Sequence, residues 1–283
     1  MNEPLIRLMT DADVPAAGTV SADAFDFDIS DPITRERWHG RLRHLLRTDP
    51  GGSFVAARDG QIAGVAQAML RDGVWILSLL TVSPTAGRGG EGRALVNASL
   101  RYGPDSGPGL IVASNDPRAL RIYGSSDGFR LEPAFQAAGA VDAAQIPELH
   151  PDITRVSADQ LDSLGAISRA VRGASHARDL VVELDRGGAI FRLADRGFVV
   201  VGPGRGVRGL AARDEQAAQA LLWYGLHTRR HDQEVEVGWI TARQQWALPV
   251  LLAARLSLRA YGAIAIRGNP GPMHPYLPSP PFA

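Results

Sequence analysis

Residues 79–95 restrict the possible folds of this chain more than any other segment. They read LLTVSPTAGRGGEGRAL. An apolar run ends at Val82, glycines follow at four of the next ten positions, and alanine and leucine then predict a helix. Glycine lets backbone N–H groups approach a ligand closely, and a helix N-terminus carries a partial positive charge. The segment therefore predicts a pyrophosphate site, to which Arg88 and Arg93 add positive charge. A flexible loop without a ligand is the alternative.

The rest of the first half predicts a mixed α/β arrangement. Asp-Gly pairs at 59–60 and 72–73 are tight-turn sequences, so residues 53–82 are expected to form three successive antiparallel strands. Thr10 can cap a helix, and Pro117 suits the first turn of another. In this half we expect strands at 5–8, 53–58, 61–70, 74–82 and 110–113, and helices at 10–25, 32–47, 92–102 and from 117 onward.

Residues 132–151 are alanine-rich with several prolines, and we place a domain boundary there. Beyond it the order of elements partly recurs, with helices expected at 158–172, 214–227 and 243–256 and strands at 189–193, 197–201, 206–212, 234–240 and 263–267. The tail after residue 267 contains six prolines, which excludes a helix or a central strand. The sequence thus predicts two α/β (α+β) domains, residues 1–140 and 151–283, each a mixed, mostly antiparallel sheet flanked by helices.

Two residue types are missing from the sequence. There is no cysteine, which excludes disulfides, thiolate metal sites and a cysteine nucleophile, and all 30 basic residues are arginine, which excludes Schiff-base chemistry on lysine. The formal net charge is zero, so bulk charge gives no reason to expect nucleic acid or an acidic membrane as a partner. Neither a membrane span nor a signal peptide is recognisable, so a cytoplasmic protein is expected.

A second motif lies beyond the glycine loop. It begins at Asn115, continues with Tyr123 and ends on Gly128 and Phe129. Together with the loop, this motif resembles the GNAT superfamily of acyl-CoA N-acyltransferases, and the resemblance covers residues 1–140.

The glycine loop carries the other part of the resemblance. The family's loop motif places a valine, a proline and two glycines at fixed spacing, and the residues on this pattern are Val82, Pro84, Gly90 and Gly92. One position departs from the pattern, because Gly87 stands where the family has glutamine or arginine, with Arg88 next to it.

The resemblance implies an enzyme that moves an acetyl group from acetyl-CoA to a primary amine. In such proteins the asparagine that corresponds to Asn115 contacts the pantetheine arm, and the tyrosine that corresponds to Tyr123 lies near the thioester sulfur and would protonate the leaving thiolate. The alternatives are a helix cap for Asn115 and a core aromatic for Tyr123. The residues expected to bind acetyl-CoA are Leu80, Val82, Gly87, Arg88, Gly89, Gly90, Gly92, Arg93 and Asn115, with backbone N–H groups near Leu80 and Val82 polarising the thioester.

The acceptor and the general base stay open. The amine is expected to attack the thioester directly, and a small-molecule amine is the expected acceptor. In many relatives a carboxylate on the fourth strand is the base, but residues 74–82 contain no carboxylate here, and Ser78 is the polar side chain that we consider in its place. The remaining candidates for the base are a water chain, the terminal carboxylate of Ala283 and one of four aspartates between the first two helices. These aspartates could also attract a cationic amine, and the alternative is that they only belong to a solvated loop. They are Asp23, Asp26, Asp28 and Asp31.

The second half is expected to be a degenerate domain of the same type. Its corresponding helix begins with Asp214 and Glu215, which satisfy the helix dipole themselves and would repel a pyrophosphate. Such a domain could shape the acceptor site or form a homodimer interface. His227 and His231 are four residues apart, but a third ligand is missing, so no metal is expected.

Two other functions remain open from the sequence. The first is an acyl-CoA sensor that has lost the transfer activity. The second is an NAD(P)-dependent oxidoreductase, because Gly204, Gly206 and Gly209 form a G-x-G-x-x-G pattern after an expected strand.

Overall fold

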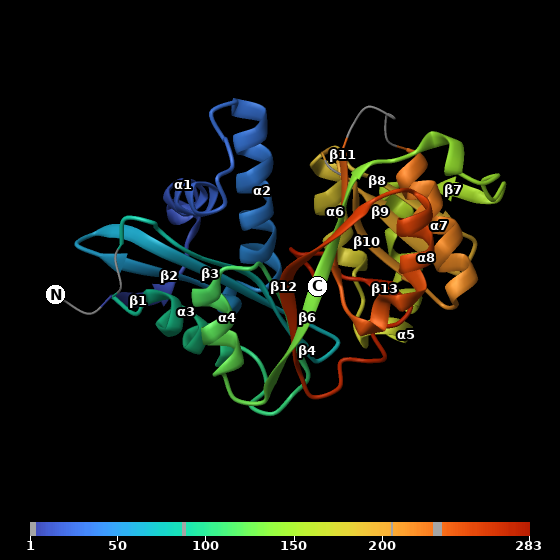
Figure 1. Ribbon diagram of the computed structural model, residues 1–283. Coiled ribbons are helices and arrows are strands. Elements are labelled where there is room, and N and C mark those ends of the chain that lie inside the picture. The colour runs from blue at the N-terminus through green and yellow to red at the C-terminus, as the bar shows by residue number, and fades with distance from the viewer. Residues whose placement is uncertain (1–3, 87–88, 205, 229–233) are drawn as a thin grey trace.

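The computed structural model describes residues 4–86, 89–204, 206–228 and 234–283, and its strands form two sheets (Figure 1). The larger sheet has the spatial order β1 (Leu5–Leu8), β2 (Ser53–Arg58), β3 (Gln61–Arg71), β4 (Val74–Val82), β5 (Gly109–Ala113), β12 (Ser257–Arg267), β6 (Phe129–Ala140) and β11 (Glu234–Ile240). All neighbours in it are antiparallel except β4 and β5.

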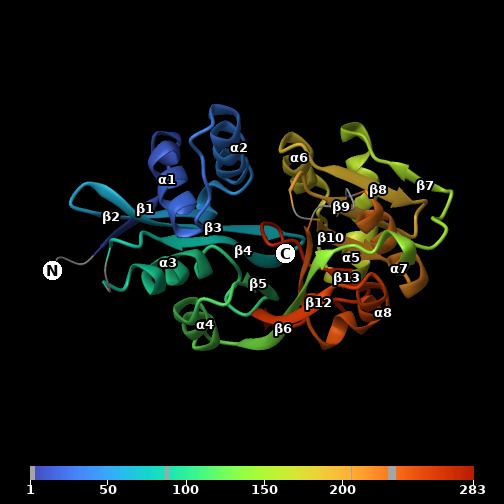
Figure 2. The same cartoon turned by 45° about the horizontal axis from the view of Figure 1, so that its top comes forward.

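Helices cover both faces of the larger sheet (Figure 2). One face carries α1 (Val14–Ala24) and α2 (Pro32–Thr48), and the other carries α3 (Glu91–Leu100) and α4 (Pro117–Gly124). The alternation of side chains along the strands explains this arrangement. On β4, Trp75 packs in the core cluster with residues of α3 and α4, whereas its neighbour Ile76 packs on the other face with Leu45 of α2.

The alanine-rich stretch after Phe129 is a strand rather than the start of a linker. β6 runs to Ala140 and pairs with β12 along most of its length, and β12 lies between β5 and β6. The first part of the stretch in which we place the domain boundary is therefore a strand, because alanine forms a strand when both of its neighbours are strands that fix the register. The strands also do not divide between the sheets at 140–151, since β11 and β12 of the second half complete the larger sheet.

The smaller sheet is also sandwiched between helices. Its order is β13 (Tyr276–Leu277), β10 (Val207–Ala212), β9 (Gly197–Val201), β8 (Ala189–Leu193) and β7 (Ile153–Arg155). One face packs against α7 (Glu215–His227) and α8 (Leu248–Ala253), and the other against α5 (Gly165–Arg172) and α6 (Ala177–Asp185). On β9, Val199 faces α7 and Val200 faces α5 and α6, which is why this strand is apolar throughout.

Most expected elements are present within a residue or two of their predicted ends, and the mixed, mostly antiparallel sheets flanked by helices confirm the fold class. Four elements were missed, namely β6, β7, α6 and β13, and β12 begins at Ser257 rather than at the predicted residue 263. Several helix starts are short 3-10 turns, at Asp11–Asp13, Ala158–Leu164 and Ala242–Ala247, and two further 3-10 turns lie at Pro50–Gly52 and Ala143–Gln145. The described part of the chain contains no helix with the length and apolar character that crossing a membrane would require.

The two halves of the chain share one core. A single cluster of buried apolar residues extends across both halves. It contains Leu45 of α2 and Ile76 of β4 from the first half. From the second half it contains Leu180 of α6, Phe198 of β9 and Tyr276 of β13. The halves are therefore packed together rather than connected only by the chain.

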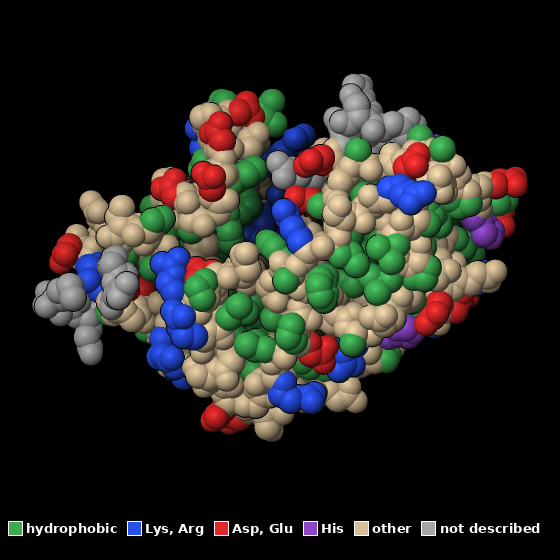
Figure 3. All heavy atoms as spheres, viewed as in Figure 1, with side chains coloured by type: hydrophobic (Ala, Val, Ile, Leu, Met, Phe, Trp, Pro, Cys, Tyr) green, Lys and Arg blue, Asp and Glu red, His purple; other side chains and the backbone are tan. Residues whose placement is uncertain are grey.

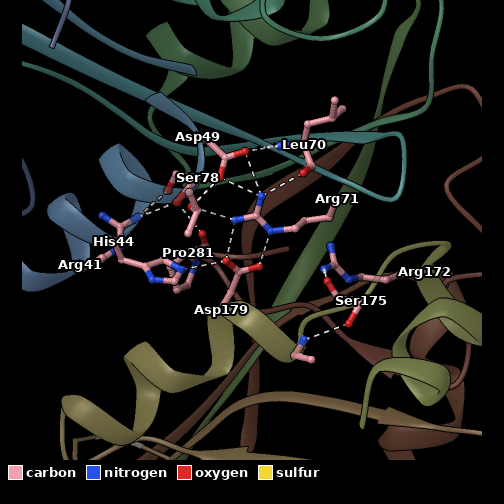
Figure 4. A network of polar contacts seen from close by, with 12 residues as sticks. Arg41, His44, Asp49, Leu70, Arg71, Ser78, Arg172, Ser175, Asp179 and Pro281 are labelled. Carbon is pink, nitrogen blue, oxygen red and sulfur yellow. Dashed lines mark hydrogen bonds and ion pairs between the residues drawn. The ribbon is translucent and has the colours of Figure 1, made fainter. Parts of the chain in front are cut away.

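A buried network of charges lies in the same interface (Figure 4). Asp179 of α6 accepts hydrogen bonds from Arg71 Nε at 2.8 Å and Nη2 at 2.7 Å, and lies 2.9 Å from His44 Nε2 of α2. Arg71 also donates to Asp49 at 2.9 Å through Nη1. Asp179 and Arg71 are 0% and 4% exposed, so the network links α2, β3 and α6 away from water.

Candidate active site

The strands β4 and β5 separate in the middle of the larger sheet. Their parallel pairing ends at Leu77 and Ile111, after which β4 continues beside β3 and β5 continues beside β12. A bulge in β4 lies at this point, because the register with β3 skips Ser78. Bulges bend a strand and re-aim its side chains, and they are common beside active sites. The divergence opens a cleft through the sheet.

The cleft has a volume of about 1320 Å³ and is bounded by both halves of the chain. The first half contributes β4 from Leu77 onward, the start of α3, the end of β5 and α4. The second half contributes Trp239, Tyr261 and the segment at Pro280. Single-ligand pockets usually measure about 300–1,000 Å³, so this cleft has room for two reactants. Figure 3 shows the hollow between α2 and the second half, with arginine side chains inside it.

The glycine loop leads into the N-terminus of α3 at one wall of the cleft. Gly90 is the N-cap and has φ +88°, a left-handed conformation that favours glycine. Gly92 approaches α4 closely, since a Cβ there would lie 3.3 Å from Ile122 Cδ1. Both glycines line the cleft, and so does Arg93, whose Nη2 lies 3.3 Å from Ser125 Oγ.

The remaining residues of the loop differ in whether they are described and whether they line the cleft. Gly87 and Arg88 lie outside the described residues. Gly89 packs close to the side chain of Arg58 and does not belong to the described lining. Glu91, in the first turn of α3, is 2% exposed and forms an ion pair with Arg58 at 2.5 Å. This pair neutralises a carboxylate that would otherwise oppose an anion at the helix N-terminus.

Leu80 and Val82 lie on the stretch of β4 that no longer pairs with β5. Because of the bulge, Ser78 and Leu79 both face α2, and Leu80 then packs on the opposite face with the core cluster under α3. The backbone of this stretch runs along the cleft, as the oxyanion hypothesis requires.

Asn115 and Asp116 stand at the start of α4, and the structure separates their roles. Asp116 is the N-cap, since its side chain accepts a hydrogen bond from the Arg118 backbone N–H at 2.8 Å. Asn115 is exposed and lines the cleft, so the reading of this residue as the helix cap is wrong.

Tyr123 lies on α4 with 5% of its surface exposed, and it both packs in the core cluster and lines the cleft. No hydrogen bond of its hydroxyl is found within residues 4–86, 89–204, 206–228 and 234–283. Burial, and to a smaller extent the negative charge of Asp116, raises the pKa of the phenol well above its usual range. Tyr123 therefore stays protonated at neutral pH.

Ser78 is not a free base on the fourth strand. Its hydroxyl donates to the Pro281 carbonyl oxygen at 2.5 Å, and Arg41 Nη2 donates to its Oγ at 3.0 Å and its carbonyl oxygen at 2.8 Å (Figure 4). These contacts tie the proline-rich tail to the bulge where β4 leaves β5.

The four candidate carboxylates between the first helices differ in position. Asp31 caps α2 by accepting from the Thr34 N–H at 2.7 Å, and Asp28 accepts from the Ser30 N–H at 2.8 Å. Asp23 lies outside the described lining, and Asp26 is the member of the set that lines the cleft. The electrostatic attraction of a cationic amine is thus left to Asp26.

Ala283 is fully buried and does not line the described cleft. Its carbonyl oxygen lies 3.1 Å from His176 Nε2, whereas Pro280 and Pro281 of the same tail reach the lining. This placement contradicts the expectation that Ala283 acts on the acceptor amine.

The pattern of glycines in the second half is not a dinucleotide site. Gly204 and Gly206 lie in the connection between β9 and β10, which pair antiparallel, and Gly209 is inside β10. Among the described residues of this connection no helix begins, and the chain enters β10 instead. The strand–loop–helix unit that binds a pyrophosphate is therefore not formed there, and the oxidoreductase interpretation is wrong. His231 lies outside the described residues, and the described ones contain no cluster of potential metal ligands.

The sequence analysis missed three arginines that line the cleft, Arg41, Arg186 and Arg208. They come from α2, from the end of α6 and from β10, so no spacing along the chain relates them. Trp38 lies one helical turn before Arg41, and the guanidinium carbons of Arg41 and Arg186 lie 5.4 and 5.9 Å from the centroid of its ring.

Comparisons with solved structures agree with the fold. A proposed acetyltransferase from Pyrococcus horikoshii is 16% identical, with a TM-score of 0.75 over 95% of this chain and 90% of that one. A GCN5-related N-acetyltransferase from Anabaena variabilis is 12% identical, with a TM-score of 0.63 over 94% and 72%. A tandem GNAT protein from the clavulanic acid biosynthesis pathway is 14% identical, with a TM-score of 0.55 over 95% and 99%. At these identities the likeness concerns the fold.

Comparison by sequence gives the family. No match is found among curated proteins. Residues 20–129, however, match the model of the acetyltransferase (GNAT) family. The matched region holds β4, the glycine loop, α3, β5 and α4, which bound the cleft on the side of the first half. Residues 20–129 therefore form a GNAT acetyltransferase domain, and the protein is an acyl-CoA N-acyltransferase.

Proposed function

We propose that this protein transfers the acetyl group of acetyl-CoA to the primary amine of a small molecule. The observation that carries the proposal is the cleft between the diverging strands β4 and β5, which gathers Val82, Gly90, Gly92, Asn115 and Tyr123 at its walls. These residues belong to two motifs that are separate in the sequence. Their meeting in one cleft supports a common ligand.

The first half holds the cofactor in this proposal. The N-terminus of α3, with Gly90 and Gly92, receives the pyrophosphate, because its free N–H groups and its dipole favour an anion and the glycines leave room for it. Arg93 adds a positive charge, and Arg88 is proposed to add a second one. The flanking glycines Gly87 and Gly89 are proposed to let backbone N–H groups approach the phosphates. Asn115 faces the pantetheine arm, which then leads toward β4 and Tyr123.

The reaction is proposed to be a direct attack of the amine on the thioester carbonyl, since the sequence contains no cysteine. Backbone N–H groups near Leu80 and Val82 stabilise the developing oxyanion. The C–S bond then breaks, and Tyr123 donates its proton to the departing thiolate. The proton of the amine passes to Asp26 or to water, because Ser78 is engaged and Glu91 and Asp116 are paired with arginines.

The second half, residues 151–283, is proposed to be a degenerate domain of the same type that shapes the acceptor side. At the N-terminus of its helix α7, the Asp214 side chain accepts from the Ala217 N–H at 2.8 Å and pairs with Arg196 at 2.7 Å. This helix end satisfies itself, which supports a single cofactor site in the first half, residues 1–140.

Calorimetric titration of acetyl-CoA tests the proposal. We expect one site per chain in the intact protein, and a loss of affinity of tenfold or more, on the order of 1.4 kcal/mol, in Gly92→Asp, which places a negative charge at the N-terminus of α3. Gly92→Ala is the matched control. Its added methyl would lie 3.3 Å from the flexible end of Ile122 and at an ordinary contact distance of 3.6 Å from Val82 Cγ2, so we expect it to bind nearly as wild type. Full binding by Gly92→Asp would contradict the site.

Acetyl transfer is then measured with a broad panel of amines. Binding of acetyl-CoA without transfer to any amine would favour an acyl-CoA sensor. Absence of binding to the intact protein would overturn the proposal as a whole.

A further inference from the structure

The acceptor side of the cleft carries an excess of positive charge. Arg41 is 3% exposed, and Arg186 and Arg208 are half-buried, yet all three line the cleft. None of them forms an ion pair with any described carboxylate within 4.0 Å. Buried guanidinium groups are normally paired, because leaving a charge without a partner away from water is costly.

The positive charges of these arginines also repel one another. Burial and, to a smaller extent, the positive charge of Arg186 lower the pKa of Arg41 to about 9. The group therefore stays charged at neutral pH, although its charge is unfavourable in this position. Glu183, 2% exposed on α6, is the carboxylate whose charge favours the charged forms of Arg41 and Arg186. Even with Asp26 also in the lining, these carboxylates are fewer than the three guanidinium groups, so this side of the cleft keeps an excess of positive charge.

One hydrogen-bond donor of Arg41 has no partner in the described parts of the chain. Its Nη2 is engaged by both oxygens of Ser78, but its Nη1 is buried without a hydrogen-bond partner in the described parts of the chain. A buried donor without a partner costs free energy that a bound acceptor atom would recover. Because Arg41 lines the cleft, its side chain is accessible to a ligand there.

This donor is close to the expected reaction centre. Ser78 is the bulged residue at which β4 leaves β5, two residues before Leu80. The ring of Trp38 lies against Arg41 and Arg186 and holds the two guanidinium groups at the same wall. Phe27 also contacts Trp38, and the centroids of the two rings are 5.4 Å apart.

We propose that the acceptor is an amine that also carries an anionic group, a carboxylate or a phosphate, and that Arg41, Arg186 and Arg208 bind this group. The inference rests on the proposed acetyl transfer and adds the chemical class of its acceptor. Guanidinium groups bind both anions through paired, charge-assisted hydrogen bonds. The anion would neutralise the excess charge and leave the amine free to face the thioester. Polycationic amines are excluded by the same charge.

Paired acceptors test this proposal. The probes are phenylalanine against phenethylamine for the carboxylate, and O-phosphoethanolamine against ethanolamine for the phosphate, within a panel of other amino acids and their amides. We expect kcat/KM for the anionic member of a pair to exceed that of its partner by ~10-fold or more, the scale of one charge-assisted contact. Whether the carboxylate or the phosphate pair responds identifies the source of the anion.

Variants connect the preference to the arginines. In Arg186→Gln we expect the ratio of kcat/KM between the anionic and neutral members to fall ~10-fold, mainly through a higher KM for the anionic acceptor. The matched control is Arg178→Gln, on the same helix α6 but exposed and outside the described lining, which should keep the wild-type ratio. An unchanged ratio in Arg186→Gln, or equal use of neutral or polycationic amines by the wild type, would overturn the proposal.

Failure of the transfer itself is distinguishable from failure of this inference. If acetyl-CoA binds but no amine is acetylated, the same pairs are titrated into the complex of the protein with CoA. Tighter binding of the anionic members, weakened in Arg186→Gln, supports the anion site without transfer. Equal binding within the pairs, or no binding of either member, counts against it.

Discussion

Replacement of Asp179 by alanine is expected to lower the free energy of unfolding by about 3–5 kcal/mol, the range found when one partner of a buried ion pair is removed. The variant leaves Arg71, which is 4% exposed, without two of its hydrogen bonds, and it removes the partner of His44. Asp49 still accepts from Arg71 at 2.9 Å, so the lower end of the range is expected.

The measurement is chemical unfolding in urea. Glu36→Ala is the control, because Glu36 is 71% exposed in its 2.8 Å pair with Arg43 on α2, and such surface pairs contribute about 0–1 kcal/mol. If Asp179→Ala costs no more than Glu36→Ala, the charge network does not hold the two halves together. A second transition in Asp179→Ala alone would show that the halves then unfold separately.

The pH dependence of unfolding provides a further readout of the same variant. Burial alone would raise the pKa of Asp179, but hydrogen bonds from His44 and Arg71 outweigh it and bring the pKa to about 2, below the ordinary 3.8. A carboxyl with a lowered pKa stabilises the folded state above its ordinary pKa, and this contribution is lost as the pH falls toward about 2. Acidification between these values should therefore destabilise the wild type more than Asp179→Ala.

Replacement of Tyr123 by phenylalanine is expected to lower turnover by ~10²-fold or more, the scale of general acid catalysis, while the affinity for acetyl-CoA changes little. The variant keeps the ring that packs in the core cluster and removes only a hydroxyl for which no hydrogen bond is found in the described structure. The fold should therefore be unaffected. Because the pKa of the phenol is raised, the proton is in place throughout the neutral range, and its ionisation should not limit the wild-type rate there.

Steady-state kinetics and calorimetry on the same preparation check this expectation. The control is Tyr224→Phe on α7, where the ring lies 4.9 Å from that of Phe191 and outside the described lining of the cleft. It should keep wild-type turnover. Equal turnover of Tyr123→Phe and wild type would remove the acid role from Tyr123, whereas a parallel loss of acetyl-CoA affinity would assign it to binding.

The sequence alone determined the elements whose signals are local. Asp-Gly pairs at 59–60 and 72–73 specified the turns of the first antiparallel strands, and the glycines before α3 marked the change from strand to helix. The start of α4 was recognisable from Pro117, although only the structure showed that its cap is Asp116 rather than Asn115. These signals succeed because turn and cap chemistry depends on a few adjacent residues.

Only the tertiary structure decided how distant segments pair and meet. It inserted β12 between β5 and β6, which turned an alanine-rich stretch into a central strand, and it brought Arg41, Arg186 and Arg208 to one wall of the cleft. The bulge at Ser78 likewise appears only when β4 is aligned with β3. Strand pairing and charge clusters depend on contacts between residues far apart in the chain, and neither periodicity nor local composition carries that information.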